Sequence, residues 1–236
     1  MNYSFTLLAL AAAGAVVFAW RSQVSHRGAV GRQRRAMWSH CDSLLEDSRI
    51  SQEDIDYPAL HGLYKGHRVV LEAIADHVGY RKLPQLWLRA SLYTKLPVAG
   101  VMDYLVRPEN IEFYSPIWSL PVSAEIPAGW PQHALLRLSD DDAMPDPGAL
   151  APHMQLFEQP QAKELVITPS GLRVVYQLAQ GERAYYAVFR SLRFDKLPVA
   201  PEPIAALLDR MLAIATDLQS GLATDRSPRR ISAIGS

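Results

Sequence analysis

The chain opens with an unbroken apolar segment. Residues 4–20 read SFTLLALAAAGAVVFAW and contain no charged side chain. As an α-helix these seventeen residues would span about 26 Å, close to the ~30 Å hydrocarbon core of a bilayer. Tyr3 and Trp20 bracket the segment, as aromatic residues do at membrane interfaces. The pattern predicts a transmembrane anchor in residues 1–20.

Arginines follow the apolar segment and predict its orientation. Five of them lie in the next fifteen residues: Arg21, Arg27, Arg32, Arg34 and Arg35. Basic residues that flank a span stay on the cytoplasmic side. We therefore expect a single-pass protein of a bacterial-type inner membrane, with its main domain cytoplasmic. These arginines either attract anionic lipid headgroups, at about 1 kcal/mol each near the surface, or act only as a topology signal.

Three other interpretations of the N-terminal segment fit the residues less well. A cleaved signal peptide needs basic residues before the apolar run and a small-x-small cleavage site. Residues 1–6 contain no lysine or arginine, and residues 18–21 (FAWR) are a poor site. An interfacial amphipathic helix needs a polar face, which this segment lacks. A buried core helix is rarely so uniformly apolar at a chain terminus.

Further along the chain, alternating apolar and polar positions predict strands. The clearest case is residues 85–95, where alternate residues on one face are Leu86, Leu88, Ala90 and Leu92. Two hairpins are indicated by Lys65-Gly66 and by Pro169-Ser170-Gly171 between apolar segments. The expected strands are residues 59–64, 67–74, 85–95, 164–168, 172–179 and 184–193.

Helical spacing of apolar residues is clearest near the C-terminus. From Ile204 to Leu218 the apolar side chains recur every 3.6 residues, after Pro201 and Pro203. This helix should pack on the sheet, with Leu208 and Met211 buried. Residues 34–48 are also expected to be helical, and residues 51–54 (SQED) resemble a capping box that starts another turn.

Two regions of the chain resemble each other. Residues 66–70 match 171–175, and residues 91–99 match 191–200 with one insertion, giving eleven identities in the same order. A helix-like segment follows each block, at residues 101–105 and from residue 204. The pattern predicts a duplicated strand-strand-strand-helix unit. The alternative is that hairpins draw on few residue types and the matches reflect composition.

Together these elements predict an α+β fold with an antiparallel sheet. An N-terminal transmembrane helix would be followed by a basic, helical juxtamembrane linker and a domain of two related halves, and the chain would end in a disordered tail. The halves would be joined by a proline- and aromatic-rich connector that packs across the domain as the lid or wall of any cleft. The expected bounds are 1–20 for the anchor, 21–57 for the linker, 58–223 for the domain, 59–106 and 163–218 for its halves, 107–161 for the connector and 224–236 for the tail.

Composition narrows the possible functions. The chain has 24 basic and 24 acidic residues, a formal net charge of zero, whereas a general nucleic-acid binder normally has a basic excess. The hydrophobic share of 49% suffices for a sizeable core. The single cysteine, Cys41, agrees with a reducing compartment.

No common catalytic motif is present: the chain lacks the Walker, Rossmann, G-x-S-x-G and H-E-x-x-H patterns. The tripeptide His40-Cys41-Asp42 suggests a nucleophile or metal ligands, but adjacent helical side chains point about 100° apart and do not converge. Ser170 is better explained as a turn residue. We therefore expect no catalytic or cofactor-binding residues.

Metal-binding patterns are equally weak. Across a two-residue turn at Lys65-Gly66, His61 faces Val70 and His67 faces Tyr64, on opposite sides of the sheet. Asp140-Asp141-Asp142 with Asp146 lacks the ligand spacing of an EF-hand. The remaining candidates, His133 and His153, have no metal-like spacing. We expect no metal site.

The leading hypothesis is a membrane-tethered, non-enzymatic accessory or partner-binding protein. It would contact the membrane through residues 4–20, bind a partner protein and bind no nucleic acid. The alternative is a membrane-bound enzyme or small-ligand sensor with a site between the two halves. A flat, aromatic-rimmed surface would favour the first hypothesis, and a pocket with convergent polar groups the second.

Overall fold

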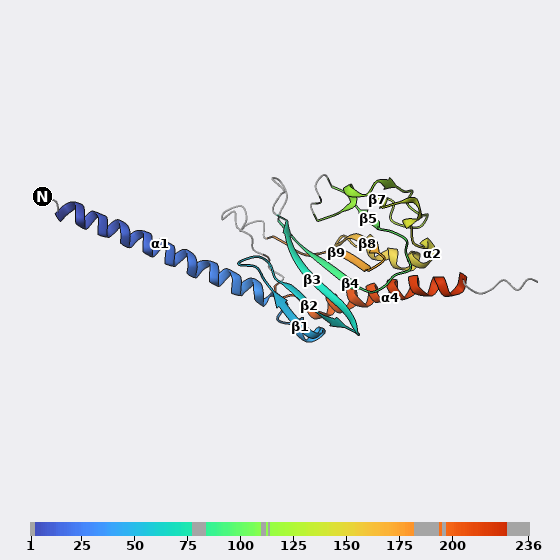
Figure 1. Cartoon of the computed structure of the whole chain (residues 1–236), viewed down its shortest axis with the longest axis horizontal. Helices are drawn as coiled ribbons and strands as arrows, with labels where there is room; N and C mark the ends of the chain where they lie inside the picture. Colours follow the sequence, from blue (N-terminus) through green and yellow to red (C-terminus); the bar gives the residue numbers. More distant parts are fainter. Residues whose placement is uncertain are drawn as a thin grey trace, which may run out of the picture.

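One antiparallel sheet forms the body of the molecule (Figure 1). The computed structural model describes residues 3–76, 84–109, 112, 114–181, 194 and 197–225, with side chains from residue 13 to residue 221. In these ranges the strand order is β1-β2-β3-β4-β9-β8-β5-β7-β6. The strands are β1 (Glu46–Ser51), β2 (Ala59–Tyr64), β3 (His67–Asp76), β4 (Gln85–Tyr93), β5 (Met102–Val106), β6 (Val122–Ser123), β7 (Ala134–Leu138), β8 (Ala162–Thr168) and β9 (Gly171–Gln180).

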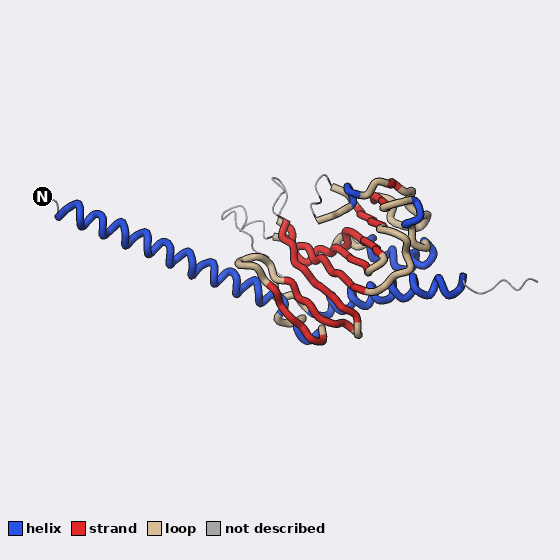
Figure 2. The backbone as a smooth tube through the Cα atoms, in the orientation of Figure 1, coloured by secondary structure: helices blue, strands red, loops and turns tan. Residues whose placement is uncertain are grey.

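Two long helices accompany the sheet, and the fold is α+β as predicted. Helix α1 (Tyr3–Arg35) projects away from the sheet, whereas α4 (Pro201–Asp225) lies along it (Figure 2). Short helical segments complete the described part: α2 (Pro147–Leu150) and the 3-10 helices η1 (Ala36–Trp38), η2 (Asp42–Leu44), η3 (Ile117–Ser119), η4 (Asp141–Ala143) and η5 (Ala151–Glu158).

The main core lies between α4 and one face of the sheet. The predicted alternation in β4 is confirmed, because Leu86, Leu88, Ala90 and Leu92 are all buried in this core. The apolar stripe of α4 is also confirmed, and Leu208 and Met211 are fully buried. Burial of these side chains is the dominant favourable term in folding. The predicted packing of this helix on the sheet therefore holds.

Both predicted hairpins are present, but their glycines have different roles. In the first, Tyr64 pairs with His67 across the Lys65-Gly66 turn, where both residues have positive φ. In the second, Thr168 pairs with Gly171, so Gly171 is the first residue of β9 rather than part of the turn. A Cβ at Gly171 would clash with the carbonyl oxygen of Leu92 on β4. The second glycine is therefore required by close strand packing.

Two helical predictions are wrong. Residues 101–105 were expected to be helix-like, but Met102–Val106 form β5 in the middle of one half of the sheet. All five residues are buried, because both faces of β5 are covered, so the strand shows no alternation. Within residues 34–48, the last two residues of α1 and the short helices η1 and η2 are helical. Residues 46–51 instead form the edge strand β1. Residues 51–54 end this strand and start no helix.

The two halves share a hairpin but diverge after the third expected strand. The first block leads into β5, whereas the second leads into α4. The expected strand at 184–193 lies outside the described residues, as does the tail from residue 226 onward. Part of the connector, which was expected to be a lid or wall, belongs to the sheet itself, since β6 and β7 extend the sheet beyond β5.

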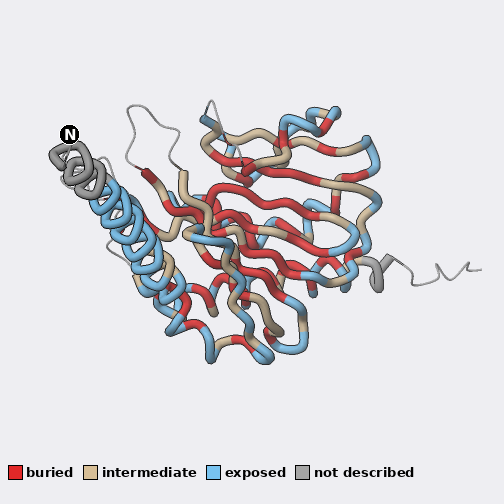
Figure 3. The backbone as a smooth tube through the Cα atoms, turned by 60° about the vertical axis from the view of Figure 1, so that its left-hand side comes forward, coloured by how far each residue is buried: buried red, intermediate tan, exposed pale blue. Residues whose placement is uncertain are grey.

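Among the described side chains of helix α1, those in its last turns contact the rest of the molecule. Arg27 pairs with Asp54, and the guanidinium of Arg34 donates to the carbonyl of Ile55. Residues 13–29 are exposed, as the pale blue helix in Figure 3 shows. Within the residues that have described side chains, no helix has both the length and the apolar character needed to cross a bilayer. The predicted anchor, residues 1–20, lies partly outside that set, because it includes residues 1–12.

Truncation of Leu208 should test the α4 core. Leu208→Ala leaves a cavity against the sheet and should lower the free energy of unfolding of the full-length chain by about 2–5 kcal/mol. Urea unfolding followed by circular dichroism measures the loss. Arg210→Ala, at an exposed position one residue short of Met211, should change stability by less than about 0.5 kcal/mol. Equal losses from both variants would contradict this assignment of the core.

Candidate functional site: the charged face of the sheet

The sheet face opposite α4 carries charged and aromatic side chains. Strand register aligns one row of residues across seven strands, from β2 to β7: His61, Val70, Ser91, Arg173, Val166, Asp103 and Arg137. The next row, on β3, β4, β9 and β8, holds Glu72, Arg89, Val175 and Glu164. We call this surface the charged face.

Two acids lie buried on the charged face. Asp103 and Glu164 are both 0% exposed, on the neighbouring strands β5 and β8. The hydroxyl of Ser115 donates to Asp103 Oδ2 at 3.5 Å. Within the described part of the chain, the other Asp103 oxygen, both Glu164 oxygens and Arg173 Nε are buried without a hydrogen-bond partner. These four atoms mark the least satisfied polar region of the molecule.

Burial controls the protonation of this acid pair. It raises the pKa of Asp103, and the nearby charge of Glu164 raises it further. It also raises the pKa of Glu164, against the opposing effects of the Ser115 hydroxyl and the Arg173 guanidinium. Two acids this close disfavour double ionisation, so the pair retains a proton above the usual carboxyl range. Because neither acid is exposed, they are closed to a dissolved substrate.

A segment of the connector seals the acids from solvent. Tyr114 packs on Trp87 with ring centroids 5.5 Å apart, and both join Val175 in a small second core. The following residues continue over β5 and β7, where Arg137 donates to the carbonyl of Leu120 at 2.9 Å. Residues 114–120 therefore cover the β5–β7 side of the charged face.

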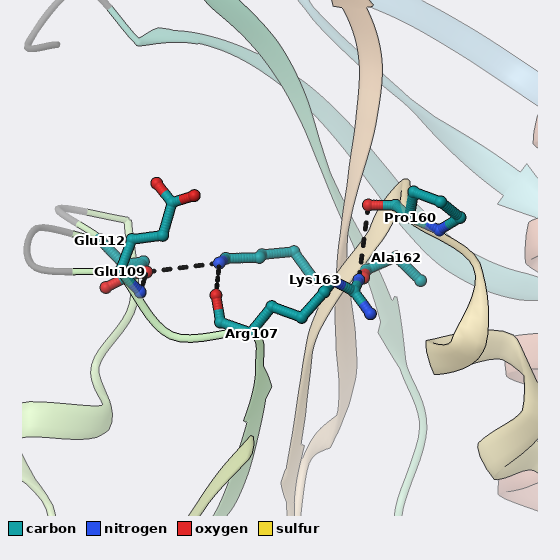
Figure 4. Close-up of polar contacts among 6 residues, drawn as sticks. All are labelled: Arg107, Glu109, Glu112, Pro160, Ala162 and Lys163. Atoms are coloured by element: carbon teal, nitrogen blue, oxygen red, sulfur yellow. Dashed lines mark hydrogen bonds and ion pairs between the residues drawn. The ribbon is translucent and has the colours of Figure 1, made fainter. Parts of the chain in front are cut away.

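A buried lysine ties this segment to the sheet (Figure 4). Lys163 occupies a bulge in β8, and its Nζ lies 3.3 Å from Glu112 Oε1 while donating to the carbonyl of Arg107. Burial lowers the pKa of Lys163, and the charge of Glu112 opposes this shift. Arg107 in turn donates to the backbone carbonyls of Phe157, Gln159, Pro160 and Ala162. These contacts fix where the connector leaves β5.

Two large aromatic side chains are exposed on this side of the molecule: Tyr93 on the open part of the charged face, and Trp118 in the segment that covers the β5–β7 side. Tyr93 is 44% exposed and Trp118 is 56% exposed. Each lies beneath an arginine: Arg68 is 4.8 Å from the Tyr93 ring, and Arg137 is 5.6 Å from the Trp118 ring. Outside α1, these are the exposed large hydrophobic residues of the described chain. Cation–π contact keeps such arginines ordered while leaving them accessible.

A bidentate ion pair lies between the open and sealed parts. Arg89 donates to both carboxylate oxygens of Glu72, at 2.8 and 2.9 Å, and this lowers the pKa of Glu72. The two side chains are about one-third exposed, so solvent screens the pair and its contribution to stability is small. It links β3 to β4 at a position four residues along each strand from the Arg68–Tyr93 pair.

The structure places the sequence candidates away from this face or in structural roles. Cys41 is buried and its thiol donates to the Val199 carbonyl at 3.4 Å. Burial, with a smaller effect of Glu202, raises the pKa of Cys41 to about 11, which makes the thiol a poor nucleophile. His40 and Asp42 are exposed and do not converge on it.

The histidine and aspartate candidates are also accounted for. His61 pairs with Val70 and His67 with Tyr64, as expected from the two-residue turn. Asp140 and Asp146 cap η4 and α2 by accepting backbone N–H groups. The remaining three candidates make structural contacts. Ser170 lies in its hairpin turn, and His153 Nε2 lies 2.8 Å from Asp217 Oδ2. The backbone carbonyl of His133 accepts a hydrogen bond from the backbone N–H of Arg107. Within the described residues, no three potential metal-binding side chains gather at one point.

Sequence reasoning missed the acid pair and Arg173. The sequence does contain a usable signal: Asp103 lies in the otherwise apolar segment VMDYLV, and Glu164, next to Lys163, lies among the apolar residues of AKELVI. A charge inside such a strand requires a partner on the same face. The opposite charge that acts on both acids, Arg173, comes from a third strand, β9, which only the folded sheet identifies.

A pocket of about 460 Å³ lies at the start of α4, on the other side of the sheet from the acids. It is lined mainly by apolar side chains, among them Leu178, Val199 and Ile204. Its polar lining residues are Gln161, Tyr176 and Gln177.

Comparison with known proteins gives one structural likeness. No family model matches the chain, and no curated protein matches it in sequence. Among solved structures, it is similar to the mycobacterial trehalose monomycolate transport factor A, TtfA. The identity is 15%, the TM-score is 0.40, and the alignment covers 82% of this chain and 94% of that one.

Replacing Asp103 should change how stability depends on pH. A carboxyl with a raised pKa keeps its proton in the folded chain while the unfolded chain loses it above about pH 4. Stability is therefore fullest below that pH and falls as pH rises toward the folded pKa. Asp103→Asn cannot ionise, so its free energy of unfolding should fall less between pH 5 and pH 8. Urea titrations across this range measure the slope, and Asp141→Asn, at an exposed site, should keep the wild-type slope. An unchanged slope in Asp103→Asn would count against the acid pair.

Proposed function

We propose that this chain is a membrane-tethered, non-enzymatic accessory protein that binds a partner protein through the charged face. The two exposed aromatic–arginine stacks, Tyr93 with Arg68 and Trp118 with Arg137, are the observation that carries the proposal. Tyrosine, tryptophan and arginine are the residues most enriched at energetic hot spots of protein interfaces. Both stacks lie on the face that α4 leaves uncovered.

The charged face has other properties of an interface. It is built on paired strands, so its side chains are held in position before a partner binds, which reduces the entropy cost of association. The Glu72–Arg89 pair lies on the same face of β3 and β4 as the Tyr93 stack, and Arg137 of the Trp118 stack also donates to the Leu120 carbonyl. Binding would bury the apolar rings and leave the arginines to pair with acidic groups of the partner.

The proposed membrane tether is the first part of α1 and the arginines that follow it. Val16, Phe18 and Trp20 are 68%, 75% and 67% exposed; in an α-helix Val16 and Trp20 share one face and Phe18 lies on the opposite face. An apolar helix with no polar face is stable in lipid rather than in water. Together with the uncharged residues 4–20 and the arginines that follow, this supports a membrane anchor with the sheet on the cytoplasmic side of an inner membrane.

A small-ligand sensor is the second candidate, and the pocket beside α4 favours it. Its volume of about 460 Å³ is within the range of small-molecule sites. The residues that line it include no carboxylate, histidine, lysine or arginine, and the acids with raised pKa lie on the opposite face. This pocket supports binding of an apolar molecule better than it supports catalysis.

The tether predicts integral-membrane behaviour. Alkaline carbonate should leave the full-length chain in the membrane pellet, and deletion of residues 1–20 should release it. Cys41 is buried and is a poor topology probe, so a cysteine is best introduced at the exposed turn residue Ser170. In Ser170→Cys, an impermeant maleimide should label this cysteine only after cell lysis. Full-length chain in the soluble fraction, or labelling of intact cells, would refute the tether or its orientation.

The charged face predicts which substitutions abolish partner binding. Affinity capture of the full chain in mild detergent, followed by quantitative mass spectrometry, should recover a partner that Tyr93→Ala and Trp118→Ala each reduce at least tenfold. Losses of this size correspond to more than about 1.4 kcal/mol, typical of interface hot spots. Arg210→Ala, on the exposed side of α4, should leave recovery unchanged. A partner retained by both aromatic variants would place its binding site elsewhere.

A further inference from the structure

A basic groove runs between α1 and the turn after β1. It has a volume of about 510 Å³, and its lining includes Arg27, Gly28, Gly31, Arg32, Arg35 and Asp54. In an α-helix, residues 27, 28, 31, 32 and 35 fall on one side, within about 140° of arc. One side of α1 therefore presents three arginines and two bare glycines to the groove.

The glycines let the two walls approach. A Cβ at Gly31 would lie 3.4 Å from the Asp54 carbonyl oxygen, and one at Gly28 would lie 3.5 Å from the Arg32 guanidinium. Gln52 Nε2 donates to the Gly31 carbonyl at 3.0 Å and holds the turn against the helix. The backbone of α1 at Gly31 therefore lies close to the backbone of the turn at Asp54.

The groove has an excess of positive charge. Arg27 pairs with Asp54, whereas Arg32 and Arg35 have neither an ion pair nor a hydrogen bond within the described chain. Arg34 is not among the lining residues and lies over the Tyr57 ring at 4.5 Å. Three guanidinium groups thus face one carboxylate. Guanidinium forks match the geometry of phosphate oxygens, so the groove suits a phosphate group.

The position of the groove suggests the source of that phosphate. Val24 and Arg27 lie about 6 and 10 Å along the helix from Trp20, where the apolar segment ends. The headgroup layer extends roughly 5–8 Å beyond the hydrocarbon core on each side of a bilayer. The groove therefore begins with an apolar residue at the level of the headgroups and continues into the arginines.

We propose that this groove binds the phosphate of an anionic lipid headgroup; the assignment of a lipid source rests on the proposed tether. The phosphate is held by Arg27 and Arg32, and Arg35 adds attraction from the far end. Because Arg32 and Arg35 lie about 18 and 22 Å along the helix from Trp20, this binding requires α1 to tilt so that the groove lies against the headgroups. Such binding would fix the rotation of the sheet relative to the membrane, because the groove joins α1 to the turn next to edge strand β1.

Native mass spectrometry of the full-length chain in mild detergent tests this proposal. With equal phosphatidylglycerol and phosphatidylcholine, the wild type should retain the anionic lipid at least tenfold more. Arg32→Gln/Arg35→Gln should lose this preference. The matched control Arg21→Gln/Arg210→Gln removes the same charge outside the groove, at two exposed positions, and should keep it. Melting temperatures within 2 °C of wild type would show that all variants fold.

Three results would overturn the proposal. Equal retention of both lipids by the wild type would show that the groove does not select an anion. Equal loss in the control variant would show general charge attraction rather than a site. Displacement of phosphatidylglycerol by millimolar inorganic phosphate would show that the groove takes a free anion. Carbonate extraction separates the two proposals, since groove binding in detergent can persist even if the chain proves not to be membrane-anchored.

Discussion

The pairing of β4 with β9 is the interaction on which the rest of the structure depends. It joins the β1–β4 part of the sheet to the β9-β8-β5-β7-β6 part, and its register places Ser91 opposite Arg173. Gly171 makes the close approach possible, because any side chain there would meet the Leu92 carbonyl. A shift by one residue would move every polar side chain of β4 into the α4 core.

The two faces of this sheet differ in their chemistry. One face is apolar and packs against α4, and burial of this shared core is the dominant favourable term in folding. The other carries Asp103, Glu164 and Lys163, which are costly to bury and do not by themselves stabilise the protein. The Lys163–Glu112 pair and the Arg107 contacts hold the connector over these groups. The remaining open part keeps its arginines and aromatic rings accessible.

The proposed tether, groove and interface follow one another from α1 through the edge strand β1 to the middle of the sheet. Helix α1 joins the sheet through Arg27, Arg34 and the turn at Gln52, next to edge strand β1. The open part of the charged face begins two strands further on, at β3 and β4. Orientation of α1 in a membrane would therefore also orient the surface that we propose for a partner. The groove would add a second point of attachment, which restricts rotation about the helix axis.

Local patterns in the sequence determined the elements whose surroundings are simple. The α4 stripe, the alternation of β4 and the two hairpin turns follow from periodicity and turn chemistry, because each element has one buried side and one exposed side or a short connection. The N-terminal apolar segment and the arginines after it can likewise be recognised from the sequence alone. The sequence pattern wrongly predicts a helix at β5, because both faces of this strand are buried and its residues do not alternate between apolar and polar.

Only the tertiary structure decided which charges meet. Asp103, Glu164 and Arg173 are separated by up to 70 positions in the chain, and β5, β8 and β9 bring them together through register. The two aromatic–arginine stacks arise in the same way on β3 with β4 and on η3 with β7. Sequence periodicity reports which face a residue occupies, but the partner across a sheet depends on strand order, which is set by the packing of the whole domain.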